Sequence, residues 1–406
     1  MLTAAELEAA KFDGDKVDFC HVQQVKDKLL RQAFSRLTAE WKVKIAEFVE
    51  QERYWLPDYA LYQAGKKANG NRSWVKWNKS LRDRDENAIA ELKEAEADEI
   101  AFTEFTQYVF SRQWADLRDH AAKQGVRLFG DMPLFIAADS ADVWSGQNEF
   151  ALAEDGMPSL VAGVPPDYFS KTGQLWGNPQ YSWEQMADND FAWWKKRIKR
   201  QLELVDIIRI DHFRGLEAYW EIQAGEKTAE NGRWVKAPGK ALLTALKESL
   251  GQLPLVAEDL GIITTEVNKL RKAFNLPGMK VLEFELLSGE TGFWPTENTV
   301  AYTGTHDNNT LLGWYEDDLS SEERERVREF TGEAEAVKVC RELIRRIYES
   351  TANLVILPLQ DVLLMPGCNR LNTPGTVENN WCWRLKNMPE EKERQYLSEL
   401  CKKYCR

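Results

Sequence analysis

Residues 207–215 read IIRIDHFRG, an apolar run that ends abruptly in charged residues. The apolar part predicts a short buried strand, and the charged part follows where that strand leaves the core. Arg209 and Asp211 are two residues apart, so their side chains share one face of the strand. Ions are costly to bury unless they are paired, which indicates that the pair has a purpose. In parallel α/β folds, catalytic groups stand at the carboxyl ends of strands.

The same pattern returns twice later in the chain. Residues 255–261 read LVAEDLG and residues 299–307 read TVAYTGTHD, so each apolar run again ends in acid. The three acids Asp211, Glu258 and Asp307 follow one another at nearly equal spacing, as strand-plus-helix units would place them. Carboxyl groups on successive strand ends would converge on one mouth of a barrel. Two carboxyls that flank a bond, with a third nearby, are typical of glycoside chemistry.

The composition limits the class of protein and its partners. The chain has 406 residues, of which 43% are hydrophobic and 29% charged, enough for a soluble globular fold with a large core. A net charge of −12 argues against nucleic acid and anionic membranes as partners. No apolar run approaches the roughly 18 residues that span a bilayer. The first residues lack the apolar region of a secretion signal, so we expect a cytoplasmic protein.

Cysteines and tryptophans carry weaker signals. Six scattered cysteines do not form a disulfide framework and favour free thiols in a reducing cytoplasm. Cys401 and Cys405 have the spacing of metal ligands, but no second cluster accompanies them, so we expect no metal. Sixteen tryptophans either fill the core or stack on sugar rings. Trp176, in a stretch rich in Gly, Pro and Asn, is the candidate for ligand contact.

The periodicity of apolar residues predicts helices first and an alternation of strands and helices later. Helical patterns cover residues 21–64 and 84–124, and a long irregular segment covers 136–186. Long irregular segments are usually functional, so we expect an active-site loop there. We therefore divide the chain into a mainly helical region, 1–125, and a catalytic (β/α) barrel, 126–406.

Six strands are expected in the second region, and their alternation with helices implies a parallel sheet. They lie near residues 126, 207, 255, 280, 300 and 354, and the strand near 280 is expected to cover 279–286. Helices are expected at 188–205, 237–250, 264–274 and across 320–350. An open doubly wound sheet usually shows a Gly-rich phosphate loop. No such loop appears in the sequence, which disfavours nucleotide binding.

Several longer motifs carry a resemblance to a known family. They are WLPDYAL at 55–61, GDMP at 130–133, DSADVW at 139–144, AGVPPDYFSKTGQLWGNP at 162–179, RIDHFRG at 209–215, AEDLG at 257–261, YTGTHDNNT at 302–310 and NTPGT at 372–376. With these motifs in this order, the chain resembles the amylomaltases, the 4-α-glucanotransferases of glycoside hydrolase family 77. The motif at 162–179 is the most specific of them.

The resemblance implies an α/β fold, the (β/α)₈ TIM barrel of the α-amylase type with helical insertions. Chains of the family usually begin about ninety residues earlier, with the first two strands of an eight-stranded barrel. We therefore expect an incomplete barrel in which about six of the eight strands are present.

The resemblance assigns catalytic roles to three acids, while a capping role is the structural alternative for Asp211 and Asp307. It makes Asp211 the nucleophile, and the charge of Arg209 favours the ionised form that a nucleophile needs. It makes Glu258 the general acid and base, whose pKa burial and Asp211 are expected to raise. Asp259 and Glu258 face opposite sides of the strand, so only one of them can be the catalyst, and the resemblance selects Glu258. Asp307 is implied to bind hydroxyl groups of the reacting sugar.

The resemblance also implies a set of substrate contacts. These are Asp131, Asp167, Tyr168, Phe169, Trp176, Arg209, His212, His306 and Asn372. Tyr168 and Phe169 resemble a loop that covers the acceptor side, where aromatic cover lowers the access of water. Its structural alternative is a Pro-Pro loop whose aromatic residues fill a hydrophobic gap.

The function implied is transfer of α-1,4-glucan segments to the 4-hydroxyl of glucose or of another maltooligosaccharide. The mechanism is a retaining double displacement that needs no metal or organic cofactor. The expected partners are maltooligosaccharides, α-1,4-glucans and a glucose acceptor, with neither nucleic acid nor a membrane. Two alternatives stay open: a retaining α-glucan hydrolase, and an inactive or fragmentary glucan-binding protein.

Overall fold

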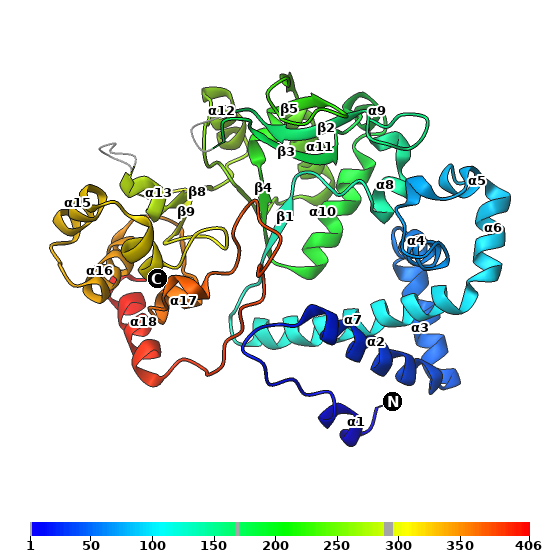
Figure 1. Cartoon of the computed structure of the whole chain (residues 1–406), viewed down its shortest axis with the longest axis horizontal. Helices are drawn as coiled ribbons and strands as arrows, with labels where there is room; N and C mark the ends of the chain where they lie inside the picture. The colour runs from blue at the N-terminus through cyan, green and yellow to red at the C-terminus, as the bar shows by residue number, and fades with distance from the viewer. Residues whose placement is uncertain (1, 167–169, 288–294) are drawn as a thin grey trace. The chain divides into compact units, whose positions relative to one another are not determined.

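A computed structural model describes residues 2–166, 170–287 and 295–406 of the chain (Figure 1). The chain forms two compact units. The first comprises Met1–Leu2 and Lys28–Phe274, and the second comprises Thr3–Asp27 and Asn275–Arg406. The division at residue 125 into a helical region and a barrel stays a prediction.

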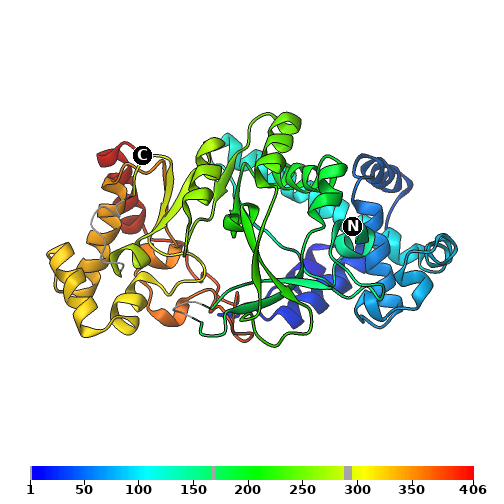
Figure 2. The ribbon, with the colours of Figure 1, turned by 90° about the horizontal axis from the view of Figure 1, so that it is seen from above.

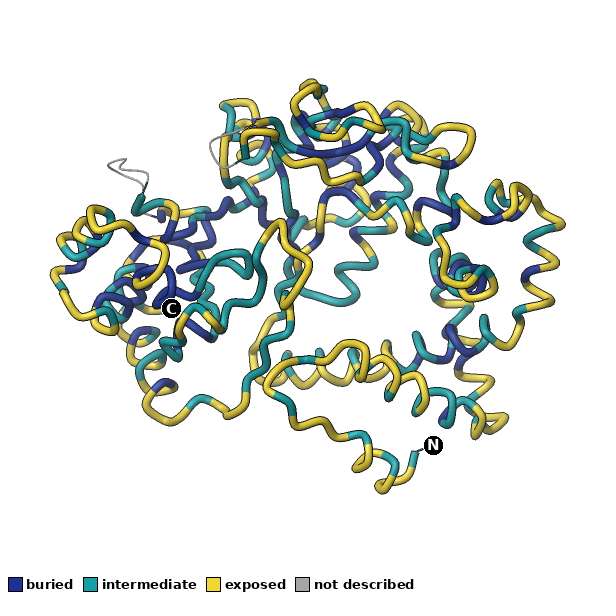
Figure 3. The backbone as a smooth tube through the Cα atoms, viewed as in Figure 1, coloured by how far each residue is buried: buried dark blue, intermediate teal, exposed yellow. Residues whose placement is uncertain are grey.

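Helices occupy the chain before the first strand. They are α1 (Ala4–Glu8), α2 (Phe19–Ser35), α3 (Ala39–Gln51), α4 (Leu56–Ala68), η1 (Trp74–Lys76), α5 (Lys79–Arg82), α6 (Glu86–Ala95) and α7 (Ala97–Lys123). The helical pattern at 21–64 is thus three helices, and Pro57 stands in the first turn of the third, where its missing N–H costs nothing. Helix α4 is the most buried of the group and packs against α7, whereas α2 and α6 are largely exposed (Figure 3).

Three parallel strands of the first unit place their carboxyl ends at one edge. The strands are β1 (Phe129–Pro133), β4 (Ile207–Asp211) and β7 (Leu255–Ala257), in the order β1-β4-β7. Asp131 lies beside Arg209, and Arg209 lies beside Val256. Helix α10 (Ala192–Leu204) packs against β1 and β4 and also contacts α11 (Gly239–Leu250) (Figure 1). This register brings the residues that end each strand together.

The segment 136–186, predicted to be irregular, contains two strands of an antiparallel sheet, so the prediction of irregular structure was wrong. Its role as an active-site loop stays a prediction. Strands β2 (Leu160–Val164), β3 (Gln174–Pro179), β5 (Ala218–Gln223) and β6 (Arg233–Lys236) pair in the order β3-β2-β5-β6. Short helices flank it: α8 (Ala141–Ser145), η2 (Gln147–Glu149), α9 (Trp183–Asp188) and η3 (Phe213–Leu216). The strand β2 pairs with β5, which lies more than fifty residues further along the chain. Local sequence does not show such a partner, which explains the error.

The second unit holds the other three parallel strands. They are β8 (Gly278–Val281), β9 (Thr299–Tyr302) and β10 (Leu354–Ile356), in the order β10-β9-β8. The predicted strand at 279–286 ends early, because Leu282–Leu287 forms helix α13. The six parallel strands expected are therefore present among the described residues. They form two sheets of three strands each.

Helices complete the second unit around a core of apolar side chains. They are α14 (Leu311–Gly313), η4 (Trp314–Asp318), α15 (Ser321–Thr331), α16 (Ala336–Glu349), α17 (Leu359–Val362), η5 (Gly367–Asn369) and α18 (Glu391–Tyr404). Helix α12 (Thr265–Ala273) belongs to the first unit. Val339, Leu343 and Ile347 follow one face of α16 at intervals of four and are fully buried. Helices α16 and α18 lie side by side, in orange and red (Figure 2).

No helix in residues 2–166, 170–287 or 295–406 has both the length and the apolar character to cross a membrane.

Candidate active site

Arg209 joins two acids at the carboxyl ends of neighbouring strands. Its guanidinium donates from Nη1 to Asp131 Oδ2, and from Nη2 to Asp211 Oδ1 at 2.9 Å. The Arg209 side chain is 9% exposed, while those of Asp131 and Asp211 are 42% and 46% exposed. A buried guanidinium requires such partners, since an unpaired ion in the interior is costly. Both carboxylates are partly exposed to solvent.

Glu258 follows β7 and is held by main-chain donors. His212 N donates to Glu258 Oε2 at 2.8 Å, and Leu260 N donates to Oε1 at 2.9 Å. Burial raises the pKa of Glu258 to about 7, and the charge of Asp211 adds to the rise. Glu258 is therefore partly protonated near neutral pH. Asp259 beside it forms an ion pair with Arg271, at 3.1 Å.

His212 packs beneath an aromatic side chain of the antiparallel sheet. Its backbone is left-handed, with φ of 55°, which turns the chain sharply after β4. The Trp176 ring meets the His212 ring edge-on, with centroids 4.9 Å apart. Burial lowers the pKa of His212 to about 4, so the ring is neutral. Its Nε2 has no hydrogen-bond partner within the described part of the chain.

Gly215 shows why the motif after β4 ends in glycine. A Cβ at this position would lie 2.3 Å from the Leu134 side chain and 3.1 Å from the His212 ring. The first contact is impossible and the second is tight, so a larger residue would displace the Leu134 side chain and press on the His212 ring. The glycine therefore belongs to the packing that fixes the imidazole.

The second unit gathers three other predicted residues after β9. Asn372 Nδ2 donates to Asp307 Oδ1 at 2.6 Å, and His306 Nε2 lies 3.5 Å from Asp307 Oδ2. The Asp307 backbone is held as well, since Arg370 Nη2 donates to its main-chain oxygen at 2.8 Å. The Trp381 ring packs against His306, with centroids 5.1 Å apart. Asp307 is thus oriented by residues that are distant in sequence.

Arg370 and Trp381 were missed from the sequence, although they flank the NTPGT motif that includes Asn372. An arginine two residues before a predicted sugar contact was the available signal. Three predicted residues, Asp167, Tyr168 and Phe169, lie outside the described residues.

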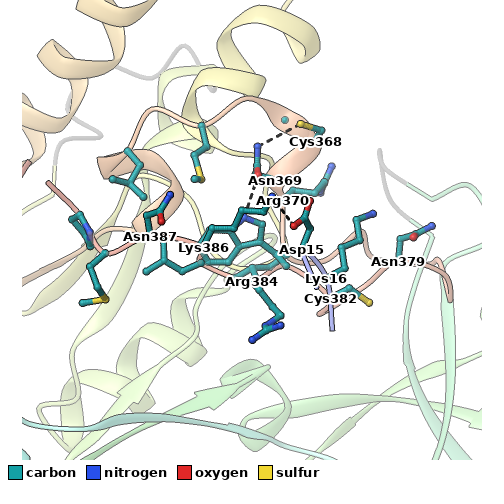
Figure 4. A pocket seen from close by; sticks show the side chains of 18 of the residues that line it. Asp15, Lys16, Cys368, Asn369, Arg370, Asn379, Cys382, Arg384, Lys386 and Asn387 are labelled. Carbon is teal, nitrogen blue, oxygen red and sulfur yellow. Dashed lines mark hydrogen bonds and ion pairs between the residues drawn. The ribbon is translucent and has the colours of Figure 1, made fainter. Parts of the chain in front are cut away.

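A cavity of the second unit is not formed by the predicted acids. It has a volume of about 780 Å³ and is lined by segments around Asp15, Asn369, Trp383 and Glu393 (Figure 4). Arg370 reaches its wall, but Asp307 does not line it. Cavity size alone therefore does not identify the site, and the chemistry of the strand ends is the better guide.

Comparison with known proteins identifies the family. The sequence model of glycoside hydrolase family 77, described as 4-alpha-glucanotransferase, matches residues 2–389. A 4-alpha-glucanotransferase of Thermus thermophilus is 45% identical over 393 residues, which cover 93% of this chain and 79% of the relative. One from Synechocystis is 44% identical and covers 93% of this chain and 77% of the relative.

A solved structure agrees with the sequences. An amylomaltase from Streptococcus agalactiae, in complex with acarbose, superposes with a TM-score of 0.95 at 34% identity. The match covers all of this chain and 84% of that one, which confirms the predicted barrel class of fold. These relatives favour the transferase over the hydrolase and the inactive binding protein. The chain therefore belongs to glycoside hydrolase family 77 and has the 4-alpha-glucanotransferase activity of that family.

Proposed function

We propose that Asp211 is the nucleophile and Glu258 the general acid and base of a retaining double displacement. The observation that carries this assignment is a pair of interacting carboxyl groups in unlike surroundings. Asp211 is paired with a buried arginine and half exposed, whereas burial raises the pKa of Glu258 to about 7. Pairs of acids whose surroundings separate their protonation states supply a nucleophile and a proton donor.

In the first step, an Asp211 carboxylate oxygen attacks the anomeric carbon of an α-1,4-linked glucan. The bond to the leaving oxygen breaks, and Glu258 gives its proton to that oxygen. The product is a β-glucosyl ester of Asp211. In the second step, the 4-hydroxyl of an acceptor sugar attacks the same carbon, Glu258 takes the hydroxyl proton, and Asp211 leaves. Two inversions restore the α configuration, and both protons are accounted for.

The residues around the acids supply binding and orientation in this proposal. The unpaired Nε2 of His212 is suited to a sugar hydroxyl, since a buried polar atom without a partner is costly. Trp176 covers His212 and offers an aromatic face to a sugar ring. Asp131 shares Arg209 with the nucleophile and has an exposed carboxylate for hydroxyl groups.

Asp307 completes the set as the third acid, with the role of binding hydroxyl groups of the reacting sugar. Its support is local: Asn372 and Arg370 fix the side chain and the backbone of Asp307, and His306 stands beside it. His306 and Asn372 are proposed as further sugar contacts. Tyr168, Phe169 and Asp167 remain proposed acceptor-side contacts on the family motif alone.

The substrates proposed are maltooligosaccharides as donors and glucose or a shorter maltooligosaccharide as acceptor. The related amylomaltase complex contains acarbose. We also propose that the enzyme acts in the cytoplasm. All six cysteines are unpaired thiols, as is usual in a reducing compartment.

The test distinguishes the roles of Asp211 and Glu258 by changing the leaving group of the donor. Fluoride departs without a proton, so α-maltosyl fluoride needs Asp211 but not protonated Glu258 for the first step. We expect E258Q to release fluoride in a burst and then stall, because no base activates the acceptor. Azide, a nucleophile that needs no base, should restore turnover and give α-maltosyl azide.

The D211N variant should release no fluoride above the uncatalysed rate, with or without azide. A burst from D211N, or equal activity of E258Q toward maltotriose and the fluoride, would contradict the assignment. With the unaltered enzyme, maltotriose should yield glucose and longer oligomers, while the total number of reducing ends stays constant.

A further inference from the structure

Glu283 is a buried acid to which the reaction assigns no role. It lies in the first turn of α13, directly after β8, and only 2% of it is exposed. Asn308 Nδ2 donates to Glu283 Oε2 at 3.0 Å. The other oxygen, Oε1, has no hydrogen-bond partner in the described structure. A Cβ on Gly304 would lie 2.9 Å from Oε1, so the carboxyl packs directly against the turn that follows β9.

The surroundings of Glu283 oppose a negative charge. Asp361, at the start of α17, is fully buried; it accepts from Leu311 N at 2.8 Å and from Thr303 Oγ1. Burial raises the pKa of Glu283 well above its usual range, and the charge of Asp361 adds to it. Asp318 raises it as well, and Arg370 is the one facing cation among the described groups that influence it. Burial likewise raises the pKa of Asp361, to about 6.

The thiol of Cys340 on α16 also faces this pair of acids, and its pKa is raised to about 12, chiefly by burial. It is therefore neutral and adds no charge. The titratable groups around Glu283 are thus two acids, one arginine and a neutral thiol. A carboxylate here would be a buried ion with too little compensating positive charge, which is destabilising.

Asn308 connects Glu283 to the turn that carries His306 and Asp307. Its Oδ1 accepts from Thr305 N at 2.9 Å and from Thr305 Oγ1 at 2.8 Å. Thr305 Oγ1 in turn accepts from Asp307 N at 3.2 Å. The bond from Nδ2 to Glu283 sets which way the Asn308 amide points. The carboxyl therefore helps to hold the turn, and Arg370 and Asn372 hold Asp307 through separate hydrogen bonds.

We propose that Glu283, acting as a neutral carboxyl through Asn308, is a positioning residue that holds Asp307 in its working orientation. This inference rests on the proposed role of Asp307. It adds a requirement that the roles of Asp211 and Glu258 do not explain: Glu283 must be uncharged for the turn to keep its shape.

Three variants of Glu283 and its neighbour test the idea. E283A removes the partner of Asn308, and we expect kcat for transfer from maltotriose to fall about 10- to 100-fold, as a displaced catalytic group does. E283Q keeps a neutral oxygen acceptor and should recover most of that loss. E285A is the matched control, since Glu285 lies on the same helix but pairs with Lys280, at 2.9 Å. It should leave kcat unchanged.

The pH profile separates positioning from mere support of the fold. With α-maltosyl fluoride as donor and glucose as acceptor, the first step needs no proton from Glu258. In the unaltered enzyme, the decline of kcat/KM that remains at alkaline pH is then due to ionisation of Glu283. In E283Q this decline should disappear or move to higher pH, because glutamine does not ionise. An unchanged alkaline limb in E283Q would overturn the inference, and this measurement needs only the conservative variant to fold.

A double-mutant cycle distinguishes the possible failures. D307A should be impaired, and adding E283A to D307A should cost little more, because both remove the same contribution. Additive losses would overturn the inference while leaving the role of Asp307 intact. Full activity of D307A would overturn the proposed role of Asp307 and, with it, the inference.

Discussion

Asp211 and Glu258 interact electrostatically, yet their neighbours make them chemically different. Arg209 pairs with Asp211, while two main-chain amides and buried surroundings hold Glu258. The amides of His212 and Leu260 lower the pKa of Glu258, but burial outweighs them and the pKa rises to about 7. The balance leaves Glu258 able both to give and to take a proton near neutral pH, as a residue that acts twice in one cycle must.

The protonation of Glu258 predicts how the rate of the first step depends on pH. The first step needs Glu258 protonated, so kcat/KM for maltotriose should fall as pH rises through about 7. The slope should approach a factor of about ten per pH unit above that value. With α-maltosyl fluoride the decline should move to higher pH, because fluoride leaves without a proton. A maltotriose profile that stays flat from about pH 6 to about pH 9 would contradict the role of Glu258.

The antiparallel sheet is the element that brings Trp176 over His212. Trp176 lies on β3, which pairs with β2, and β2 pairs with β5, the strand that follows the β4 turn and η3. The sheet is therefore tied to the same segment that carries Asp211 and His212. The sheet shields the His212 imidazole, which keeps the ring neutral. Among the described residues its Nε2 has no hydrogen-bond partner.

Removal of the tryptophan should expose the imidazole. In W176A, the pKa of His212 should rise from about 4 toward its ordinary value of 6.5, because burial is the largest cause of its lowered pKa. The measurement is an NMR titration of the His212 ring protons. L175A is the control, since Leu175 is an exposed neighbour on β3 whose side chain points to the other face. An unchanged His212 pKa in W176A would show that Trp176 does not shield it.

The start of α15 offers a separate test of local structure. Ser320 and Glu323 form a capping box, in which the Ser320 hydroxyl accepts from Glu323 N and the Glu323 carboxylate accepts from Ser320 N. S320A should lower the free energy of unfolding by about 1 kcal/mol. S321A changes the neighbouring exposed serine, which makes no cap, and should have a much smaller effect. Equal effects of the two variants in urea denaturation would contradict the capping assignment.

Across the whole molecule, buried acids of both units make stability depend on pH. Burial raises the pKa values of Glu258 and Asp361, to about 7 and about 6, and raises that of Glu283 as well. A raised pKa in an acid contributes stability that is fully present below the unfolded value and is lost as pH rises through the folded value. His212 acts in the opposite sense, because its pKa is lowered.

Comparing the unaltered enzyme with E258Q isolates the contribution of Glu258 to the pH dependence of stability. The free energy of unfolding of the unaltered enzyme, minus that of E258Q, should fall as pH rises from about 4.5 to about 7. Each pKa unit corresponds to roughly 1.4 kcal/mol, so the change should be on the order of a few kcal/mol. Urea denaturation of both proteins across this range measures it. A difference that is constant with pH would show that Glu258 has the same pKa in the folded and unfolded states.

Sequence by itself determined the parts that depend on short-range pattern. Six apolar runs marked the six parallel strands, and acids at their ends marked Asp211, Glu258 and Asp307 as candidates. The strand period of two placed Arg209 beside Asp211, and the structure shows their hydrogen bond. The family motifs supplied the activity, which the relatives confirm.

Only the tertiary structure decided what surrounds each of these groups. Residues 279–286 looked like a strand, but helix α13 turns Glu283 into the core beside Asp361. The segment 136–186 looked irregular, but pairing with β5 makes it a sheet that covers His212. The physical reason is the same in both cases. Burial, and with it the protonation state of a side chain, depends on which distant segments pack against that side chain. A local sequence pattern does not show which segments those are.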